Sequence, residues 1–335
     1  MEGIVDRITT KVLNDQALPL VIEPTNSNLS FSEFLDILGT NNPFFKKSLL
    51  KHGGLLFRNF PVQDQRDFAA VIKHLQTGDF VDYIGGDSPR TKVIDGIYTS
   101  TETPPSMTLP LHNELSYVKH FPKYIYFYCD IPPLVRGETI VADARTIYRT
   151  IDPEVKRRFT EKSLRYVSCY PYKSAFLNFI NKHHKSWVNV FESEDKREVE
   201  KKCLQHEISF EWHANDWLKI SQVLPSTIIH PQTLEKVWFN QAHHFDLNPR
   251  FLGWWRYLGV KLLYCRKNMM LHEVYFHDNT PISREDLYHI LDVLEQQSIY
   301  FPWQKGDVLL LDNILAMHGR ASFSGKRRIL TAMTN

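Results

Sequence analysis

The chain has 335 residues, of which 43% are hydrophobic and 23% charged, so it can bury a sizeable core and is not expected to be disordered. Its length suits one large domain or two ordinary ones. The 40 basic residues nearly balance the 38 acidic ones, and the net charge of +2 comes with no basic run of the kind that indicates a nucleic-acid partner.

The beginning of the chain carries no recognisable targeting signal. Residues 1–7 include acidic side chains and no apolar run, so no signal peptide is expected. No run of 18 apolar residues follows, so no transmembrane helix is predicted. The four cysteines are widely spaced, which predicts neither a disulfide framework nor a zinc site and favours a cytoplasmic protein.

The first strong elements are a buried strand and an amphipathic helix. The segment 53–60, Gly-Gly-Leu-Leu-Phe-Arg-Asn-Phe, predicts the strand. From Asp64 to Gln76, apolar residues recur at helical spacing. The segments 85–90 and 98–105 are rich in glycine, proline and hydroxyl residues, which indicates ordered loops.

A short segment with a histidine and a glutamate comes next, and two strands follow it. The segment reads Leu109-Pro-Leu-His-Asn-Glu114. The aromatic and β-branched run 124–129 predicts one strand, and 137–142 predicts another. Asp143 is suited to cap a helix that runs toward Tyr148.

The middle of the chain is highly charged. A charged helix is predicted from Pro153 to about Ser163, and the acidic and basic residues of 191–203 are typical of a solvated helix face. We expect the region of about 150–225 to be an insertion between the two segments that carry the candidate metal-site residues, serving as a lid or a docking element.

Strand character returns in the last third of the chain. Strands are predicted at 237–240, 306–313 and 327–334, and a helix is predicted at 283–297, where a serine is followed by two acids. No internal repeat or linker is visible, so we expect one domain over residues 1–335, with a β-sandwich core and helices around it.

His112, Glu114 and His318 are the candidate metal ligands. On an extended strand, His112 and Glu114 project from the same face, and His318 follows a buried strand about 200 residues later. Two histidines and one carboxylate on one face of a metal leave positions open for a cosubstrate and oxygen, as in non-haem Fe(II) oxygenases. A lone His-x-Glu pattern is weak, and a purely structural role is the alternative.

Three other histidines compete for the same role, namely His243, His244 and His272. His243 and His244 face opposite ways if the chain is extended there, and His272 with its neighbouring glutamate has the wrong spacing for one strand face. The sequence therefore disfavours all three as ligands.

Five segments of the chain occur in an order shared with a known enzyme superfamily. They are Gly54-Leu-Leu-Phe-Arg-Asn-Phe60, Leu111-His-Asn-Glu-Leu-Ser-Tyr117, Gly137-Glu-Thr139, Val237-Trp-Phe-Asn-Gln241, and Asp312-Asn with His318-Gly-Arg and Arg328. Together they resemble the taurine dioxygenase and clavaminate synthase-like superfamily of Fe(II)/2-oxoglutarate oxygenases. The resemblance spans residues 54–328, and the last segment is the most specific.

The resemblance implies a fold and a cofactor. The implied fold is α+β, with a double-stranded β-helix core of the jelly-roll or cupin type, flanking helices and a helical insertion. His112, Glu114 and His318 match the Fe(II) ligands, and 2-oxoglutarate and O2 are the implied cosubstrates. The glutamate, where many relatives have aspartate, resembles the clavaminate synthase-like branch, and the presence of a carboxylate argues against the halogenase variants.

Two further residues match the 2-oxoglutarate site of the superfamily. Arg328 matches the arginine that binds the distal carboxylate, since a guanidinium pairs with a carboxylate through two parallel hydrogen bonds. Arg327 is adjacent, and the two must face opposite sides of a strand, so only one can point into the site. Thr139 matches the threonine that hydrogen-bonds the same carboxylate, and Arg320 is expected to be structural.

The implied reaction is hydroxylation of an unactivated C–H bond, with release of succinate and CO2. The expected substrate is an amino acid or an amino-acid derivative of secondary metabolism, free or bound to a carrier protein. In taurine dioxygenases an arginine four positions beyond the 2-oxoglutarate arginine binds the sulfonate, and here that position is Ala332, which disfavours a sulfonate. The candidate substrate residues are Tyr98, Glu102, Asn113, Tyr117 and Trp238, with Glu102 suited to pair with an α-amino group.

Three alternatives stay open on the sequence. One is a desaturase or cyclase with the same cofactor. The others are a metal-binding protein without oxygenase activity and a zinc hydrolase that uses the same three ligands. No nucleic-acid or membrane partner is expected, and the sequence does not determine the oligomeric state.

Overall fold

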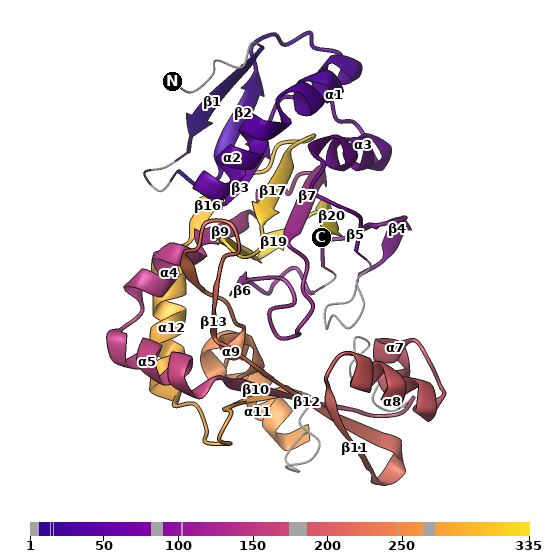
Figure 1. Cartoon of the computed structure of the whole chain (residues 1–335), viewed down its shortest axis with the longest axis vertical. Coiled ribbons are helices and arrows are strands. Elements are labelled where there is room, and N and C mark those ends of the chain that lie inside the picture. The colour runs from indigo at the N-terminus through magenta and orange to yellow at the C-terminus, as the bar shows by residue number, and fades with distance from the viewer. Residues whose placement is uncertain are drawn as a thin grey trace.

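Two β-sheets lie at the centre of the molecule, with helices on their outer sides (Figure 1). The structure, a computed structural model, describes residues 7–13, 15, 17–81, 90–101, 103–173, 186–246, 248–263 and 272–335. The predicted mixture of α and β structure is confirmed.

The larger sheet has eight strands in the order β1-β2-β3-β17-β7-β20-β5-β4. Its strands are β1 (Ile8–Val12), β2 (Leu20–Pro24), β3 (Gly54–Phe57), β4 (Lys92–Ile94), β5 (Ile97–Thr99), β7 (Tyr124–Ile131), β17 (Val308–Asp312) and β20 (Arg328–Thr334). The central strands β3 and β17 are buried along their whole length. They are covered on both faces, which explains why their sequences are continuous apolar runs without alternation.

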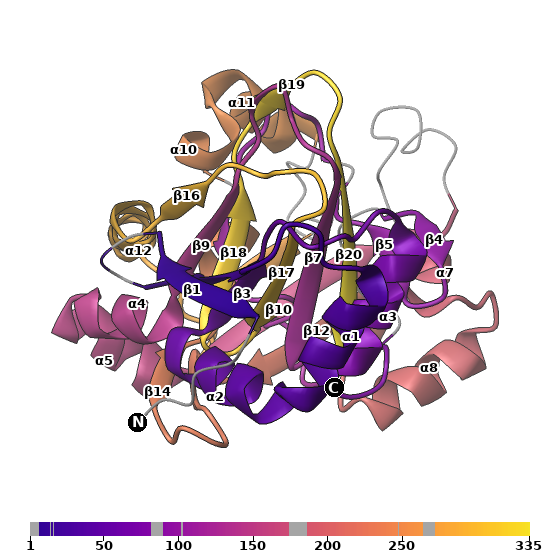
Figure 2. The ribbon, with the colours of Figure 1, turned by 90° about the horizontal axis from the view of Figure 1, so that it is seen from above.

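The second sheet has four strands in the order β16-β9-β18-β6 and packs against the first sheet (Figure 2). Its strands are β6 (Leu109–His112), β9 (Thr139–Asp143), β16 (Ile299–Phe301) and β18 (Ala316–Arg320). Side chains of both sheets meet in one buried cluster that includes Phe127 and Leu311 from the larger sheet and Val141 and Phe301 from the smaller one. Strands β6 and β18, which carry the candidate ligands, are thereby fixed to a packed core.

Three helices cover the outer face of the larger sheet: α1 (Phe31–Thr40), α2 (Asn42–His52) and α3 (Gln65–Leu75). Helix α1 begins with a capping box, in which the Ser30 hydroxyl accepts from the Glu33 N–H and the Glu33 carboxylate accepts from the Ser30 N–H. Asp64 caps the N-terminus of α3, where its side chain accepts from the N–H groups of Arg66 and Asp67. Phe68 of α3 stacks on Tyr128 of β7 with ring centroids 5.4 Å apart, which fixes this helix to the sheet.

A second set of helices covers the outer face of the smaller sheet. It comprises α4 (Ala144–Thr150), α5 (Pro153–Lys162), α9 (Ala242–Phe245) and α12 (Arg284–Gln296). The predicted cap Asp143 accepts from the N–H groups of Arg145 and Thr146, and Ser283 caps α12. Because α9 follows a buried segment beside β6, it carries side chains of the 240s to the edge of the candidate site.

A third sheet, in the order β11-β12-β10-β15, projects away from helices α1 to α3 (Figure 1). Its strands are β10 (Leu164–Tyr170), β11 (Ser209–His213), β12 (Trp217–Leu224) and β15 (His272–Phe276). Helices α7 (Trp187–Phe191) and α8 (Lys196–Gln205) and the 3-10 turn η1 (Ala214–Asp216) lie between these strands in the sequence. Helices α7 and α8 share a separate buried cluster with Tyr170 and Leu218. Strand β10 pairs with β15 from later in the chain, so this unit is built partly from outside residues 150–225.

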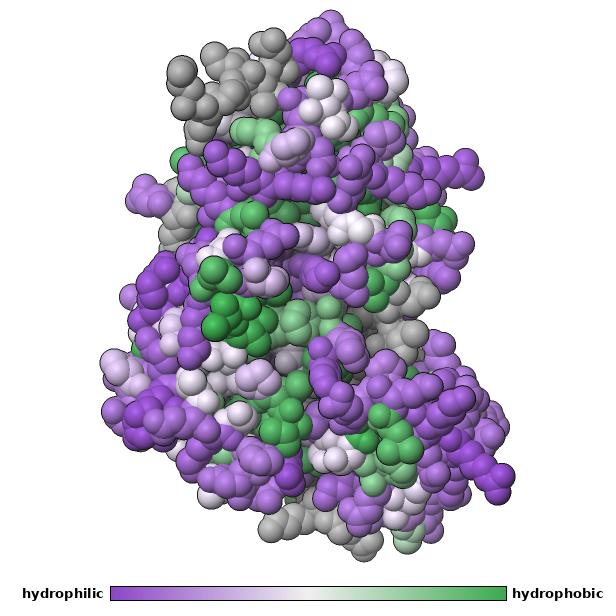
Figure 3. Space-filling view, viewed as in Figure 1, coloured by the Kyte–Doolittle hydropathy of each residue, from purple (hydrophilic) through white to green (hydrophobic). Residues whose placement is uncertain are grey.

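The remaining elements are β8 (Val135–Arg136), β13 (Thr227–Ile229), β14 (Lys236–Trp238), α10 (Pro249–Leu252), α11 (Trp254–Leu263) and β19 (Phe323–Ser324). The face in Figure 3 is largely hydrophilic, with hydrophobic patches across its middle. In the part of the chain that the structure describes, no helix is long and apolar enough to cross a membrane.

The predicted elements agree with the structure except in one loop and in the region of about 150–225, which was expected to be a helical insertion and contains the strands β10, β11 and β12 as well as helices. The helices expected at 64–76, 153–163 and 283–297 are confirmed to within about two residues at each end. The segment 98–105, expected to be a loop, begins inside β5, and the preceding strand β4 was not predicted; of the segment 85–90, only Arg90 lies in the described residues. Both strands are only three residues long and lie at the sheet edge, where β5 pairs with β20 and β4 pairs with β5, and this pairing decides their conformation more than local sequence does.

Candidate metal centre and its pocket

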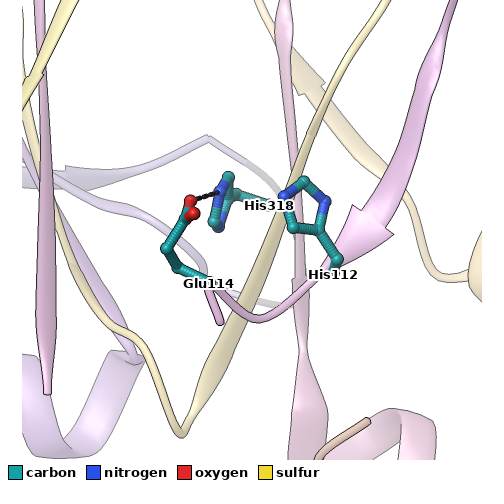
Figure 4. Close-up of side chains that lie close together, drawn as sticks. All are labelled: His112, Glu114 and His318. Carbon is teal, nitrogen blue, oxygen red and sulfur yellow. Dashed lines mark ion pairs between the residues drawn. The ribbon is translucent and has the colours of Figure 1, made fainter. Parts of the chain in front are cut away.

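His112, Glu114 and His318 come together at the meeting point of β6 and β18 (Figure 4). His112 is the last residue of β6 and pairs directly with His318 of β18. Glu114 lies in the turn after β6, so the expectation that both residues of the His-x-Glu pattern sit on one strand is wrong. The turn redirects the glutamate and still brings its carboxylate to the histidines.

The ligand atoms of the three residues lie within 4.8 Å of one another. His318 Nε2 is 3.4 Å from Glu114 Oε2, and the imidazole centroids of His112 and His318 are 4.4 Å apart. Glu114 and His318 are buried, which shields a bound ion from bulk water. Such a separation fits three donors around one small cation.

The environment sets the protonation states that a metal requires. Burial, and then the neighbouring His318, lower the pKa of His112 to about 3, so its imidazole is neutral at neutral pH. Burial alone would raise the pKa of Glu114, but Arg90 and then His318 outweigh it and hold that pKa well below its usual range. The site therefore offers neutral nitrogen and anionic oxygen donors.

The tautomer of His112 is set by a hydrogen bond to the backbone. Its Nδ1 lies 2.9 Å from the Pro110 carbonyl oxygen, so Nδ1 carries the proton and Nε2 keeps its lone pair for a metal. Two imidazoles and one carboxylate suit Fe(II), and three donors leave other coordination positions open. The residues present therefore fit the iron that the sequence predicts.

Two asparagines hold the turn that carries Glu114. Asn313 accepts from the Glu114 N–H at 2.7 Å and donates to the Glu114 carbonyl at 3.0 Å. The Asn113 amide donates to the Asn313 carbonyl at 2.6 Å. Asn113 is fully buried and is absent from the pocket lining, so its predicted contact with substrate is wrong and it shapes the turn instead.

A pocket opens beside the three candidate ligands. Among the described residues, its lining also contains Arg90, Ser100, Thr101, Leu109, Tyr117, Phe127, Thr139, Gln241, His244, Phe245, His272, Gly319, Arg320 and Arg327. The lining thus combines apolar and aromatic walls with three guanidinium groups and a single carboxylate, that of Glu114.

Arg327, and not Arg328, belongs to this pocket. The Arg327 Nε donates to the Gly137 carbonyl at 3.0 Å, and burial followed by the nearby Arg320 lowers the Arg327 pKa to about 10, which leaves it charged at neutral pH. Arg328 instead donates to Asp130 at 2.6 Å, with 41% of its side chain exposed. Strand alternation admits only one of the two, and the structure places Arg327 in the pocket where the sequence predicted Arg328.

Thr139 lines the pocket, as its predicted role requires. Its hydroxyl oxygen accepts from the Trp303 indole N–H at 3.0 Å, so the hydroxyl proton remains available to a ligand. Arg320 donates to the carbonyl oxygens of Thr103, Pro104 and Met107, which fits its expected structural role although it also reaches the pocket.

The other predicted substrate residues divide. Tyr117 lines the pocket. Tyr98 lies in β5 opposite Thr331, and the lining begins two residues later, so a direct contact is not supported. Trp238 is fully buried and packs on Phe159 at 5.1 Å between ring centroids, so its predicted place in the pocket is wrong. Glu102 lies outside the described residues.

The competing histidines do not belong to the metal cluster. Among the described residues, the group able to hold a metal comprises only His112, Glu114 and His318. His244 and His272 nevertheless line the pocket, and the His244 ring lies 5.0 Å from that of His112. His243 is buried, with Nε2 2.8 Å from the Leu111 carbonyl oxygen.

Sequence reasoning missed several lining residues. Arg90 ends the segment Gly-Gly-Asp-Ser-Pro-Arg, and that sequence pattern predicted a loop without indicating that the arginine lines a pocket. Gln241 closes one of the segments that resemble the superfamily, and its Nε2 donates to the Asn113 carbonyl at 2.7 Å. His272 and Phe245 come from elements far from β6 in the sequence, and only the tertiary fold brings them to the pocket.

Comparisons with known proteins agree with this site. The model of the family described as taurine catabolism dioxygenase TauD, TfdA family, matches residues 14–334. The chain is 31% identical over 313 residues to the dapdiamide synthesis protein DdaC of Enterobacter agglomerans, covering 93% of this chain and 90% of that protein. It is 29% identical over 332 residues to a clavaminate synthase-like protein of Arabidopsis thaliana, covering 96% and 95%.

The fold is also similar to solved structures. A taurine dioxygenase from Burkholderia xenovorans superposes with a TM-score of 0.53 at 12% identity, covering 98% of this chain and 89% of that one. The family match extends over nearly the whole sequence and includes the ligand cluster. The predicted superfamily, its iron cofactor and its 2-oxoglutarate cosubstrate are thereby confirmed, and the chain belongs to the TauD/TfdA family of dioxygenases.

Proposed function

We propose that this dioxygenase uses Fe(II) and 2-oxoglutarate to hydroxylate an unactivated C–H bond of an amino acid or an amino-acid derivative. The observation that carries the proposal is one pocket that holds the His112–Glu114–His318 cluster together with a partly buried arginine, Arg327, that no carboxylate of the described residues neutralises. A buried unpaired cation is costly unless a ligand supplies the opposite charge.

Arg327 and Thr139 are the proposed partners of the distal carboxylate of 2-oxoglutarate. A guanidinium binds a carboxylate through charge-assisted hydrogen bonds, and Arg327 Nε is already oriented by the Gly137 carbonyl. Trp303 donates to the Thr139 oxygen, which turns the threonine proton toward another acceptor. This assignment replaces the predicted Arg328 by its neighbour.

His112, Glu114 and His318 are the proposed ligands of Fe(II). When bound, the metal supplies the activation of O2 that amino-acid side chains lack. The chain contributes the fixed ligand set and the surrounding walls. Phe127 and Leu109 line the pocket and keep water from the reacting centre.

The charge balance of the pocket favours a substrate with a carboxylate. Among the described residues, the lining holds three positive charges, on Arg90, Arg320 and Arg327, against one negative charge, on Glu114. Fe(II) adds two positive charges and 2-oxoglutarate two negative ones, so a positive excess remains. The carboxylate group of an amino acid, or of another acid of similar size, can pair with one of these guanidinium groups.

A sulfonate of the taurine type remains disfavoured after the correction to Arg327. The position four residues beyond Arg327 is Thr331, which is fully buried and donates its hydroxyl proton to the Tyr126 carbonyl at 2.8 Å. Neither Thr331 nor the originally considered Ala332 offers a cation. Tyr117, Phe245 and His272 are the side chains proposed to contact the substrate instead.

Two structural expectations join this proposal. The two facing sheets are proposed to form the double-stranded β-helix of the family, within one domain over residues 1–335. The region of about 150–225 is proposed as a lid or carrier-docking element, because the sheet that supports α7 and α8 reaches the pocket through His272 of β15.

The first test is spectroscopic. Anaerobic protein loaded with Fe(II) should develop a visible charge-transfer band when 2-oxoglutarate is added, since the cosubstrate chelates the metal. Well-folded, iron-loaded protein that shows no band would contradict the proposed cofactor site.

The second test identifies the substrate class. Succinate release is measured over a panel of free amino acids and the same amino acids loaded on a carrier protein. Release coupled to a product that has gained one oxygen atom supports hydroxylation. A product that has lost two hydrogen atoms points to desaturation or cyclisation.

A further inference from the structure

Arg90 places a buried cation directly against a proposed metal ligand. Its side chain is only 5% exposed and lines the pocket. Its terminal nitrogen donates to Glu114 Oε2 at 2.8 Å, and the Glu114 side chain is itself 4% exposed. Contact between two buried charges at this distance is a strong, charge-assisted hydrogen bond.

The hydrogen bond falls on the oxygen that also faces the histidines. Oε2, which accepts from Arg90, is the oxygen that lies 3.4 Å from His318 Nε2. Arg90 therefore selects the side-chain rotamer in which Glu114 presents one oxygen toward the ligand cluster. Glutamate needs such a restraint more than aspartate does, because it has one more rotatable bond between backbone and carboxylate.

Backbone contacts do not supply this restraint. Asn313 fixes the main-chain N–H and carbonyl of Glu114, and the carboxylate lies beyond both. Among the described side chains, Arg90 is the cation that contacts the Glu114 carboxylate, since the other contact comes from the imidazole of His318. Ligands are held in their working geometry by partners outside the coordination sphere, and these partners matter nearly as much as the ligands.

We propose that Arg90 is a positioning residue that makes Glu114 bind the metal through one oxygen. One oxygen from Glu114 and two histidine nitrogens would hold the metal and would leave its other coordination positions open for 2-oxoglutarate and O2. A glutamate free to rotate can supply both oxygens and take a position that the cosubstrates need. This inference rests on the proposed ligand role of Glu114.

The experiment uses Co(II) as a spectroscopic substitute for Fe(II) in the full-length protein, because its visible absorption changes with coordination number. Wild type, Arg90→Gln and Arg90→Lys are loaded with Co(II) and titrated anaerobically with 2-oxoglutarate. We expect Arg90→Gln to change the Co(II) spectrum and to weaken 2-oxoglutarate binding about 10- to 100-fold, the range typical of lost outer-sphere partners. Arg90→Lys keeps one charged donor and should recover part of both signals.

Arg58→Gln is the matched control. Arg58 forms another buried ion pair, with Asp307 at 2.6 Å and side-chain exposures of 7% and 1%, but it does not line the pocket. This variant should lose thermal stability and keep the wild-type Co(II) spectrum and 2-oxoglutarate affinity. A change of both signals in the control would show that they follow general stability, and would overturn the inference.

The remaining outcomes are also decisive. Wild-type spectrum and affinity in folded Arg90→Gln overturn the positioning role, as does Arg90→Lys that recovers neither signal, because packing would then explain the loss. If Arg90→Gln does not fold, Arg90→Lys is read alone, and a loss of both signals in it as large as the loss expected for Arg90→Gln contradicts the inference. Failure of the wild-type protein to bind Co(II) or 2-oxoglutarate contradicts the proposed function itself.

Discussion

Arg327 and Arg328 are neighbours in the sequence, yet their guanidinium groups lie on opposite sides of the larger sheet. Arg327 donates to Gly137 and lines the pocket, whereas Arg328 pairs with Asp130. The rest of β20 keeps the same alternation: Ile329 and Met333 join the cluster between the sheets, and Leu330 and Ala332 join the one beneath the helices. One position in register thus decides which arginine can meet a ligand.

The first prediction separates the two arginines. Arg327→Ala should weaken 2-oxoglutarate binding by about 2–5 kcal/mol, the usual cost of removing one partner of a buried charge pair. Arg328→Ala removes an ion pair that is partly exposed and should change stability by less than about 1 kcal/mol, with no effect on 2-oxoglutarate. Anaerobic titration of the charge-transfer band measures the 2-oxoglutarate affinity of both variants. A larger loss of affinity in Arg328→Ala than in Arg327→Ala would return the 2-oxoglutarate role to Arg328.

The second prediction concerns the Thr139 hydroxyl. Thr139→Val keeps the shape of the side chain but removes the acceptor for Trp303 and the proposed donor to 2-oxoglutarate. We expect the free energy of unfolding to fall by about 1–3 kcal/mol, and 2-oxoglutarate to bind about ten- to a hundredfold more weakly. Thr139→Ser should retain most of both. A valine variant with unchanged 2-oxoglutarate affinity would remove Thr139 from the site.

The third prediction tests the metal ligands. His112→Ala and His318→Ala should each lower metal affinity by more than about a hundredfold, since even outer-sphere changes cost 10- to 100-fold. Metal content after gel filtration, measured by mass spectrometry, reports the loss. His120→Ala, at an exposed histidine outside the pocket, is the control and should retain full metal content. Stoichiometric metal in either ligand variant would point to another site.

The fourth prediction follows from the burial of Trp238. Trp238→Ala should destabilise the protein by about 3–5 kcal/mol because it opens a cavity in the core. Trp238→Phe should be milder, since the Trp238 indole N–H has no hydrogen-bond partner in the described part of the chain and its loss costs nothing. Denaturant unfolding measures stability. Succinate release by Trp238→Phe should stay at the wild-type rate, and a raised KM for substrate would return this residue to the pocket.

The fifth prediction is a pH dependence of stability. Burial lowers the pKa of His243 to about 4 from its usual 6.5, so the unfolded chain binds a proton there that the folded chain does not. The stability linked to His243 is therefore present above pH 6.5 and is lost as the pH falls toward 4. Between pH 7 and 4.5 wild type should lose about 2 kcal/mol more than His243→Gln, measured by urea unfolding at each pH. Parallel losses would contradict the lowered pKa.

The sequence predicted the ligand set because chemistry restricts its residue types. His112, Glu114 and His318 are nitrogen and oxygen donors that suit Fe(II), and they stand in segments that resemble the superfamily. The sequence also predicted where helices begin, because the side chains of Asp64, Asp143 and Ser283 accept hydrogen bonds from backbone N–H groups of the first turn, without help from distant residues. What depends on residue type and near neighbours was therefore determined by the sequence alone.

The tertiary structure decided which side chains reach the pocket. The residue types of Asn113 and Trp238 suit a substrate contact as well as a structural role, so the sequence could not decide between the two. Packing in the folded chain places Asn113 in the turn and Trp238 in the core. Strand register chose Arg327 over Arg328, and the fold carried Arg90 to Glu114 across 24 residues. These contacts depend on the direction of each side chain in three dimensions. A residue-by-residue pattern leaves that direction open, because a shift of one position reverses the face on which a strand residue lies.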